Sequence, residues 1–150
     1  NLEAKKFIGY PVKMKINHEA MTKAFMENMP KAGMYAMKSG LKHGDFLPAS
    51  VYTKYDEQTG ETEFYIGLIL NKDIKPADGM MELNLPAGEG LKISKFGQYG
   101  TGDFEAHTAL ANFLSKNKME QSFPIWETFP NDPMKVKPVD IQTDIFYPVK

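Results

Sequence analysis

The sequence has 150 residues, of which 42% are hydrophobic and 12% aromatic, and a formal net charge of −1 from 18 basic and 19 acidic side chains. This size and composition predict one globular domain over residues 1–150, and the balanced charge argues against direct contact with nucleic acid or an anionic membrane. The absence of cysteine excludes disulfides and thiolate chemistry and favours a cytoplasmic location.

The first part of the chain changes from a strand pattern to a helix pattern. Lys5–Ile16 has the alternation of a β-strand, and Asn17 is a typical N-cap for the helical spacing of apolar residues that follows. Pro30 interrupts that spacing. We therefore expect a kink there, or a second short helix that starts at Pro30 and ends near Gly40.

The remainder indicates a hairpin, a charged connector, a helix and a closing pair of strands. The clearest helix carries an apolar stripe of Phe104, His107, Ala111 and Leu114, with lysines in its last turn. The predicted elements are strands at Leu47–Tyr55, Glu61–Leu70, Met80–Leu85 and Leu91–Tyr99, a helix at Asp103–Lys118, and strands at Pro124–Phe129 and Asp144–Val149.

The order of these elements is β-α-β-β twice, which indicates an internal repeat with halves at about 5–72 and about 79–150. We therefore predict an α+β fold in which two β-α-β-β repeats with pseudo-twofold symmetry form one antiparallel sheet. The helices would cover one face, and a groove would follow the seam between the repeats. Such a seam is a natural small-molecule site.

Glu127 is a lone carboxylate inside the predicted aromatic strand Pro124–Phe129, where it is flanked by Ile125, Trp126 and Phe129. Strand alternation directs Ile125, Glu127 and Phe129 to one face and Trp126 to the other. If the first face is covered, Glu127 loses water and becomes a site where a positively charged ligand is favoured. The alternative is an ordinary strand whose solvent-facing side carries Glu127.

Four motifs in order resemble the gyrase-inhibitor-like small-molecule-binding domain, which is also the effector-binding domain of multidrug-sensing transcription activators of the AraC and MerR types. The motifs cover the second half of the chain, and the first half is similar only in architecture. They are Pro86-Ala87-Gly88, Gly97-Gln98-Tyr99, Glu127 with Asn131-Asp132-Pro133, and Thr143-Asp144-Ile145 with Pro148-Val149.

The resemblance implies that Glu127 is a pocket acid that recognises cationic, aromatic molecules, and that aromatic residues line the same cavity. Phe129 stands where the family often has tyrosine. The candidate ligand-binding residues are Glu127, Tyr147, Tyr99, Tyr52, Tyr65, Phe129 and Trp126, of which Trp126 is directed away from Glu127 by strand parity. The expected partners are a small molecule and a fused or separate regulatory partner.

Two other functions stay open. Some relatives of this fold hydrolyse reactive small molecules, and a pocket Glu127 with Tyr99 or another tyrosine could activate water. The chain could also be a protein-binding inhibitor of a larger partner, such as a gyrase-modulating protein. His18, His43 and His107 are too scattered for a metal motif, so we expect no metal and no cofactor. The first residue is Asn1 rather than Met, so a preceding domain is also left open.

Overall fold

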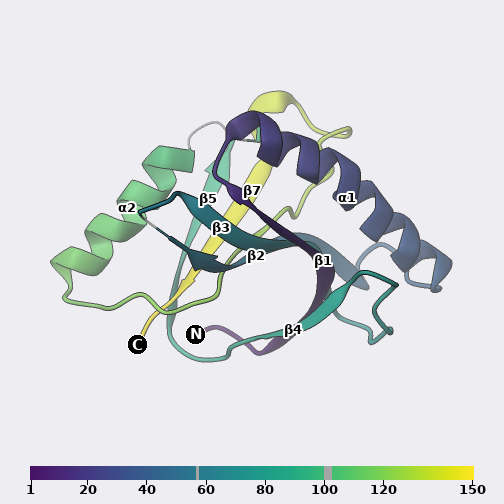
Figure 1. Ribbon diagram of the computed structural model, residues 1–150, viewed down its shortest axis with the longest axis horizontal. Coiled ribbons are helices and arrows are strands. Elements are labelled where there is room, and N and C mark those ends of the chain that lie inside the picture. Colours follow the sequence, from purple (N-terminus) through teal and green to yellow (C-terminus); the bar gives the residue numbers. More distant parts are fainter. Residues whose placement is uncertain (57, 100–102) are drawn as a thin grey trace.

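The computed structural model describes residues 1–56, 58–99 and 103–150, and within them the chain forms an α+β fold with one seven-stranded antiparallel sheet (Figure 1). The elements, in chain order, are β1 (Lys5–Lys15), α1 (His18–Lys38), β2 (Phe46–Tyr55), β3 (Glu61–Leu70), β4 (Met81–Leu85), β5 (Gly90–Phe96), α2 (Asp103–Lys116), β6 (Ile125–Thr128), the short 3-10 helix η1 (Pro138–Asp140) and β7 (Gln142–Pro148).

The sheet order β4-β1-β3-β2-β6-β7-β5 confirms the predicted pair of β-α-β-β halves. The first half contributes β1-β3-β2 and the second half contributes β6-β7-β5, so the same arrangement appears in reverse on either side of the sheet centre. The two halves meet where β2 pairs with β6, from Ala49 opposite Thr128 to Tyr52 opposite Ile125. This β2–β6 ladder is the seam of the molecule.

Both helices cover the same face of the sheet, as predicted, and they diverge from one another in Figure 1. Under α1, Ala32 and Ala36 pack on Ile8 and Leu68, which belong to β1 and β3. Under α2, a second cluster forms on the other half of the sheet. Its buried members are Ala106, Leu110, Leu114, Ile145 and Tyr147.

The other face of the sheet encloses a separate core. Phe7, Val51, Tyr65, Leu85 and Trp126 are buried there, from strands of both halves. The sheet curls around this core, because residues 86–89 alone connect β4 and β5, which lie at opposite edges.

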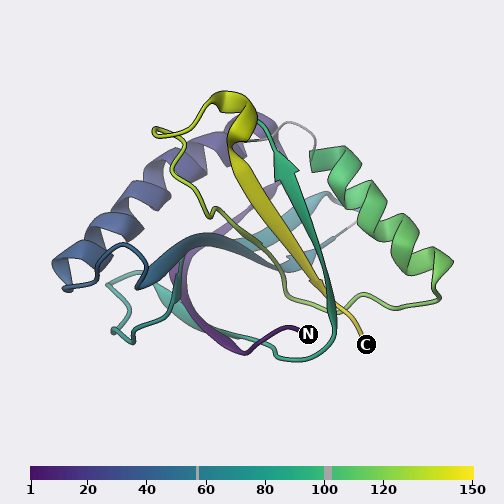
Figure 2. The same cartoon turned by 180° about the vertical axis from the view of Figure 1, so that it is seen from behind.

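Residues near both ends of the chain form backbone hydrogen bonds with residues 86–89, the link between β4 and β5 (Figure 2). The backbone N–H of Leu2 donates to Gly88 O at 2.6 Å, and Gly88 N–H donates back to Leu2 O at 3.0 Å. From the other end, Val149 N–H donates to Glu89 O at 3.1 Å. Gly88 has a φ of +130°, which favours glycine at this turn. These bonds continue the β1–β4 and β5–β7 pairings into the link that joins the two edges.

Two local features, one in each helix, differ from the sequence-based expectation. No second helix starts at Pro30, because α1 runs uninterrupted through it. Pro30 lies on the exposed side of α1, where water can solvate the carbonyl that its missing N–H leaves unpaired. The two strands predicted at Met80–Leu85 and Leu91–Tyr99 are present as β4 and β5, and β4 pairs with β1 at the edge of the first half.

The stripe of α2 is also rotated from the predicted one. Ala106, Leu110 and Leu114 are buried, whereas Ala111 is exposed and His107 is half-buried. The side chain of Phe104 lies outside the part of the chain that the structure describes. The buried side chains are thus spaced by four residues from Ala106, and only Leu114 belongs to both the predicted and the observed stripe.

Gly9 and Gly67 face each other across the β1–β3 ladder. A Cβ at Gly67 would lie 2.0 Å from Ile8 O and 2.5 Å from Gly9 Cα, both rigid backbone atoms. The strands can therefore keep this register only without a side chain at position 67.

Gly67→Ala is expected to lower the free energy of unfolding by about 1–3 kcal/mol through overpacking of the β1–β3 ladder. Gly33→Ala is the matched control, because position 33 is inside α1 and, apart from the adjacent residues and the backbone of its own helix, no atom of the described residues lies within 4 Å of a Cβ there. It should raise the free energy of unfolding by about 0.5–1 kcal/mol. Urea denaturation of the wild type and the two variants measures both changes in the free energy of unfolding. Equal changes in the two variants would contradict the close approach of β1 and β3 at Gly67.

Candidate functional site

A row of side chains across the helix-covered face determines where Glu127 lies. Strand register pairs Ile66 with Ser50, Ser50 with Glu127, and Glu127 with Ile145. Directly paired residues share a face, and Ile66 packs under α1 while Ile145 packs under α2. Glu127 is therefore near the middle of the sheet, between the two helix-covered cores, and only 12% of its side chain is exposed.

A cavity of about 770 Å³ lies over this part of the seam. It is large enough for a drug-sized molecule. Its walls come from both halves, so neither repeat could form it alone. The lining residues are Ile16, Met21, Tyr52, Tyr55 and Thr62 from the first half and His107, Glu120, Gln121, Phe123, Ile125, Glu127 and Tyr147 from the second.

Three polar side chains from three elements meet in this cavity. His107 comes from α2, Glu127 from β6 and Tyr147 from β7. His107 Nε2 lies 3.5 Å from Glu127 Oε1, and His107 Nδ1 makes a hydrogen-bonding contact with the Tyr147 hydroxyl. The imidazole thus bridges the acid and the phenol, and we call these residues the Glu127–His107–Tyr147 group.

The surroundings of Tyr147 keep its phenol protonated. Burial is the larger effect and the nearby Glu127 carboxylate is the smaller one, and together they raise the pKa of Tyr147 to about 12. At neutral pH the Tyr147 hydroxyl therefore remains a hydrogen-bond donor and acceptor without charge.

Among the described residues, the side chains that line the cavity include glutamates but no lysine. Besides Glu127, it has Glu120, whose side chain is 75% exposed at the rim and forms an ion pair with Lys150 at 3.7 Å. The rest of the wall is mainly apolar or aromatic. Of the two glutamates in the cavity, Glu127 is thus the one whose charge is screened less by water.

The aromatic residues predicted from the sequence divide into three places. Tyr52 and Tyr147 line the cavity with Glu127. Tyr52 also stacks on Phe64, with ring centroids 5.2 Å apart, which ties it to the core under α1.

Tyr99 and Phe129 lie together outside the cavity lining. Their rings meet edge to face at 5.3 Å, and Phe129 also contacts Phe25 of α1 at 6.0 Å. Tyr65 and Trp126 are on the opposite face of the sheet, in the core that the sheet encloses. Trp126 stacks there on Phe146, in agreement with the strand parity that directs it away from Glu127.

Sequence analysis did not identify His107 as a cavity residue. The scattered histidines gave no motif, because His107, Glu127 and Tyr147 are 20 residues apart or more. One available signal was the position of His107 within the apolar stripe predicted for a helix expected to cover the ligand face. A polar side chain there borders the covered surface.

Ser50 adds an unpaired polar group beside Glu127. Its side chain is fully buried, and Ser50 Oγ has no hydrogen-bond partner within the described residues. A buried hydroxyl without a partner costs about 1–3 kcal/mol. The middle of the seam therefore contains a second buried polar group, the Ser50 hydroxyl, in addition to the Glu127 carboxylate.

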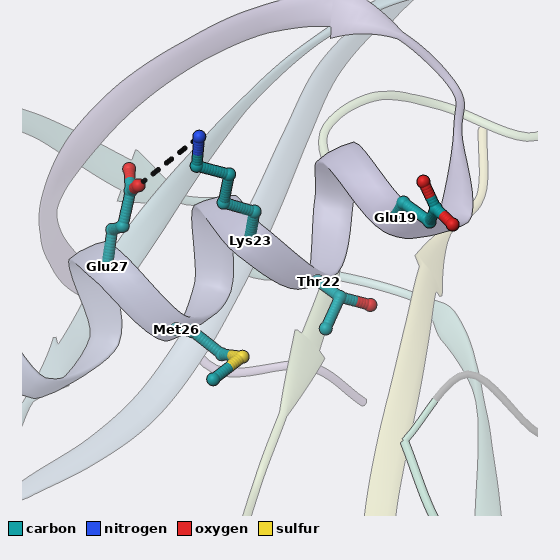
Figure 3. A pocket seen from close by; sticks show the side chains of 5 residues that line it. All are labelled: Glu19, Thr22, Lys23, Met26 and Glu27. Atoms are coloured by element: carbon teal, nitrogen blue, oxygen red, sulfur yellow. Dashed lines mark ion pairs between the residues drawn. The ribbon is translucent and has the colours of Figure 1, made fainter.

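A second hollow, of about 550 Å³, lies on the outer side of α1 (Figure 3). Its residues Glu19, Thr22, Lys23, Met26 and Glu27 all come from this one helix, and Lys23 pairs with Glu27 at 4.0 Å in an exposed contact. Because no second element walls it, this hollow does not compete with the seam cavity as a ligand site.

Other site types have little support in the part of the chain that the structure describes. No three His, Asp or Glu side chains gather there as a metal ion would require. No helix among the described residues is both long and apolar enough to cross a membrane.

The fold is a duplicated antiparallel sheet with a cavity at its seam, an arrangement that suits the binding of a small molecule. The chain belongs to the GyrI-like family, because the model for the GyrI-like small molecule binding domain matches residues 1–150. This agrees with the resemblance found in the sequence. Comparison with curated protein sequences gave no significant match.

Solved structures share the fold at low sequence identity. The C-terminal domain of EcmrR aligns with a TM-score of 0.77 and 14% identity, covering 99% of this chain and 93% of that chain. EcmrR in its DNA complex gives 0.76 and 15%, with 99% of this chain covered and 55% of that chain, so the chain spans about half of that protein. SAV2435 bound to tetraphenylphosphonium gives 0.65 and 11%, covering 99% and 90%.

The raised pKa of Tyr147 predicts a loss of stability at alkaline pH. Between pH 10.0, the ordinary value, and about 12, the folded protein keeps a proton that the unfolded chain releases, so stability falls as the pH rises through this window. Urea unfolding at several pH values should show a smaller alkaline loss for Tyr147→Phe than for the wild type. Identical losses of stability in the two proteins would contradict the raised pKa of Tyr147.

Proposed function

We propose that the seam cavity binds an apolar, cationic and preferably aromatic small molecule, with Glu127 as its charge anchor. One observation carries the proposal: a carboxylate that is only 12% exposed lies in a largely apolar wall without lysine among the described residues. Low local polarity strengthens the attraction of a cation to this carboxylate. Contacts between the cation and the faces of Tyr52 or Tyr147 would add about 0.5–2 kcal/mol each.

A structural neighbour supports this class of ligand. SAV2435 has the same fold, with a TM-score of 0.65, and it was solved bound to tetraphenylphosphonium. That ligand is a permanent cation surrounded by aromatic rings, which matches the charge and the walls of the cavity described above. Tetraphenylphosphonium is therefore the probe of choice for this chain.

We further propose that the domain acts as the ligand-sensing part of a regulatory system in the cytoplasm. EcmrR, which has the same fold over about half of its length, was solved in complex with DNA. The regulatory partner of this domain would be fused to it or separate from it. The near-neutral charge of the domain favours a role in which the partner, and not this domain, contacts DNA.

Glu127→Gln is expected to weaken tetraphenylphosphonium binding by about tenfold or more, because it removes the poorly screened charge while keeping the shape of the side chain. Glu120→Gln is the matched control in the same cavity, and its exposed position predicts a change of less than about threefold. Isothermal titration calorimetry measures both, and thermal unfolding checks that each variant folds.

The neutral ligand triphenylphosphine oxide separates charge recognition from a general loss of the cavity. Its affinity should change little in Glu127→Gln. Equal losses for the neutral and the cationic ligand would reject Glu127 as the charge anchor, and so would equal effects of the two glutamate substitutions.

Hydrolysis of a reactive small molecule is the second candidate function. The Glu127–His107–Tyr147 group supports it, because an acid, an imidazole and a protonated phenol together could position and deprotonate water. Two neighbours with the same fold are described as hydrolases from Listeria innocua, with TM-scores of 0.58 and 0.56. The tyrosine in this group is Tyr147 and not Tyr99.

Product analysis with strained electrophilic substrates tests hydrolysis. Turnover by the wild type that Glu127→Gln abolishes, with substrate binding retained, would assign an enzyme. Binding without product would leave the cavity as a receptor site.

A further inference from the structure

His107 lies where a cationic ligand would meet Glu127. Its Nε2 is 3.5 Å from Glu127 Oε1, and 37% of the His107 side chain is exposed to the cavity side and solvent. The distance permits an ion pair when the imidazole is protonated. The partial exposure allows the ring to move aside or to gain a proton from water.

Tyr147 orients the ring of His107 without deciding its charge. The Tyr147 hydroxyl contacts His107 Nδ1 and stays protonated at neutral pH. It can donate a hydrogen bond to a neutral imidazole or accept one from an imidazolium. In both states, Nε2 is directed towards Glu127.

Few other charges face this ring. Tyr52 and Tyr55 on β2, and Glu120 before β6, share the cavity with it, and Glu120 is exposed and paired with Lys150. On β5, which packs under α2, Lys95 is buried on the helix-covered face, with its Nζ 3.4 Å from Gln98 O. Among the described residues, Glu127 is thus the carboxylate in ion-pair contact with His107.

We propose that His107 is an internal competitor that sets the charge specificity of the cavity. As an imidazolium it neutralises Glu127 and excludes a cationic ligand, and as a neutral imidazole it leaves the carboxylate available. This inference rests on the proposed function of the cavity. It makes His107 a specificity-determining residue, and it makes cation binding release a proton from His107.

Tetraphenylphosphonium tests the inference because its own charge does not change with pH. Histidine side chains gain charge as the pH falls from 8 to 5. The affinity of the wild type should therefore fall by about tenfold between pH 8 and pH 5.5, because a proton on the imidazole puts a positive charge beside Glu127. In His107→Gln the same pH change should alter the affinity by less than about twofold.

His43→Gln is the matched control, since His43 is exposed in the loop between α1 and β2 and does not line the cavity. This variant should lose affinity for tetraphenylphosphonium between pH 8 and pH 5.5 as much as the wild type does. A loss that persists in His107→Gln would assign the titration to another group, such as Glu127 itself, and would overturn the proposal.

Proton release in the wild type gives a second measurement that needs no variant. Calorimetry at pH 6.5 in buffers of different ionisation enthalpy should detect a fraction of a proton released per ligand bound, and none at pH 8.5. Absence of release at pH 6.5 would overturn the role of His107 while leaving cation binding intact. Absence of binding at every pH would instead reject the proposed function itself.

Discussion

The β2–β6 ladder is the contact on which the cavity depends. Its four residue pairs join the two repeats into one continuous sheet, and they place Ser50 opposite Glu127 at the junction. Because the side-chain period of a strand is two, a slip of one residue would turn Glu127 towards the opposite face and bring Trp126 under the helices. The apolar core around Trp126 opposes such a slip, so the packing on one face fixes the chemistry on the other.

The two halves contribute differently to the site even though their topology is the same. The first half supplies apolar and aromatic wall, such as Met21 and Tyr52, whereas the second half supplies the Glu127–His107–Tyr147 group. A carboxylate in such a wall is costly unless a cation or a donor compensates it. His107 lies 3.5 Å from the acid and can compensate its charge when protonated, and a bound cation would do the same.

Much of the fold could be predicted because its signals are local. The strand pattern of Lys5–Ile16 and the hairpin after Leu47 depend on alternation and turn residues that act over a few positions. The errors arose where packing outweighed a local preference. Pro30 does not break α1, since its ring faces solvent and the buried alanines on the other side hold the helix to the sheet.

The sequence by itself determined the duplicated α+β topology, the shared face of Ile125, Glu127 and Phe129, and the opposite direction of Trp126, because strand periodicity and element order are properties of the chain alone. Only the tertiary structure showed that this shared face is the one the helices cover. Only the tertiary structure decided which aromatic residues accompany Glu127, and it placed Tyr52 and Tyr147 in the cavity but Tyr65 in the opposite core. It also brought His107 to the acid. The physical reason is that these neighbours meet through strand pairing and helix docking, which join residues far apart in the chain and leave no periodic trace in the sequence.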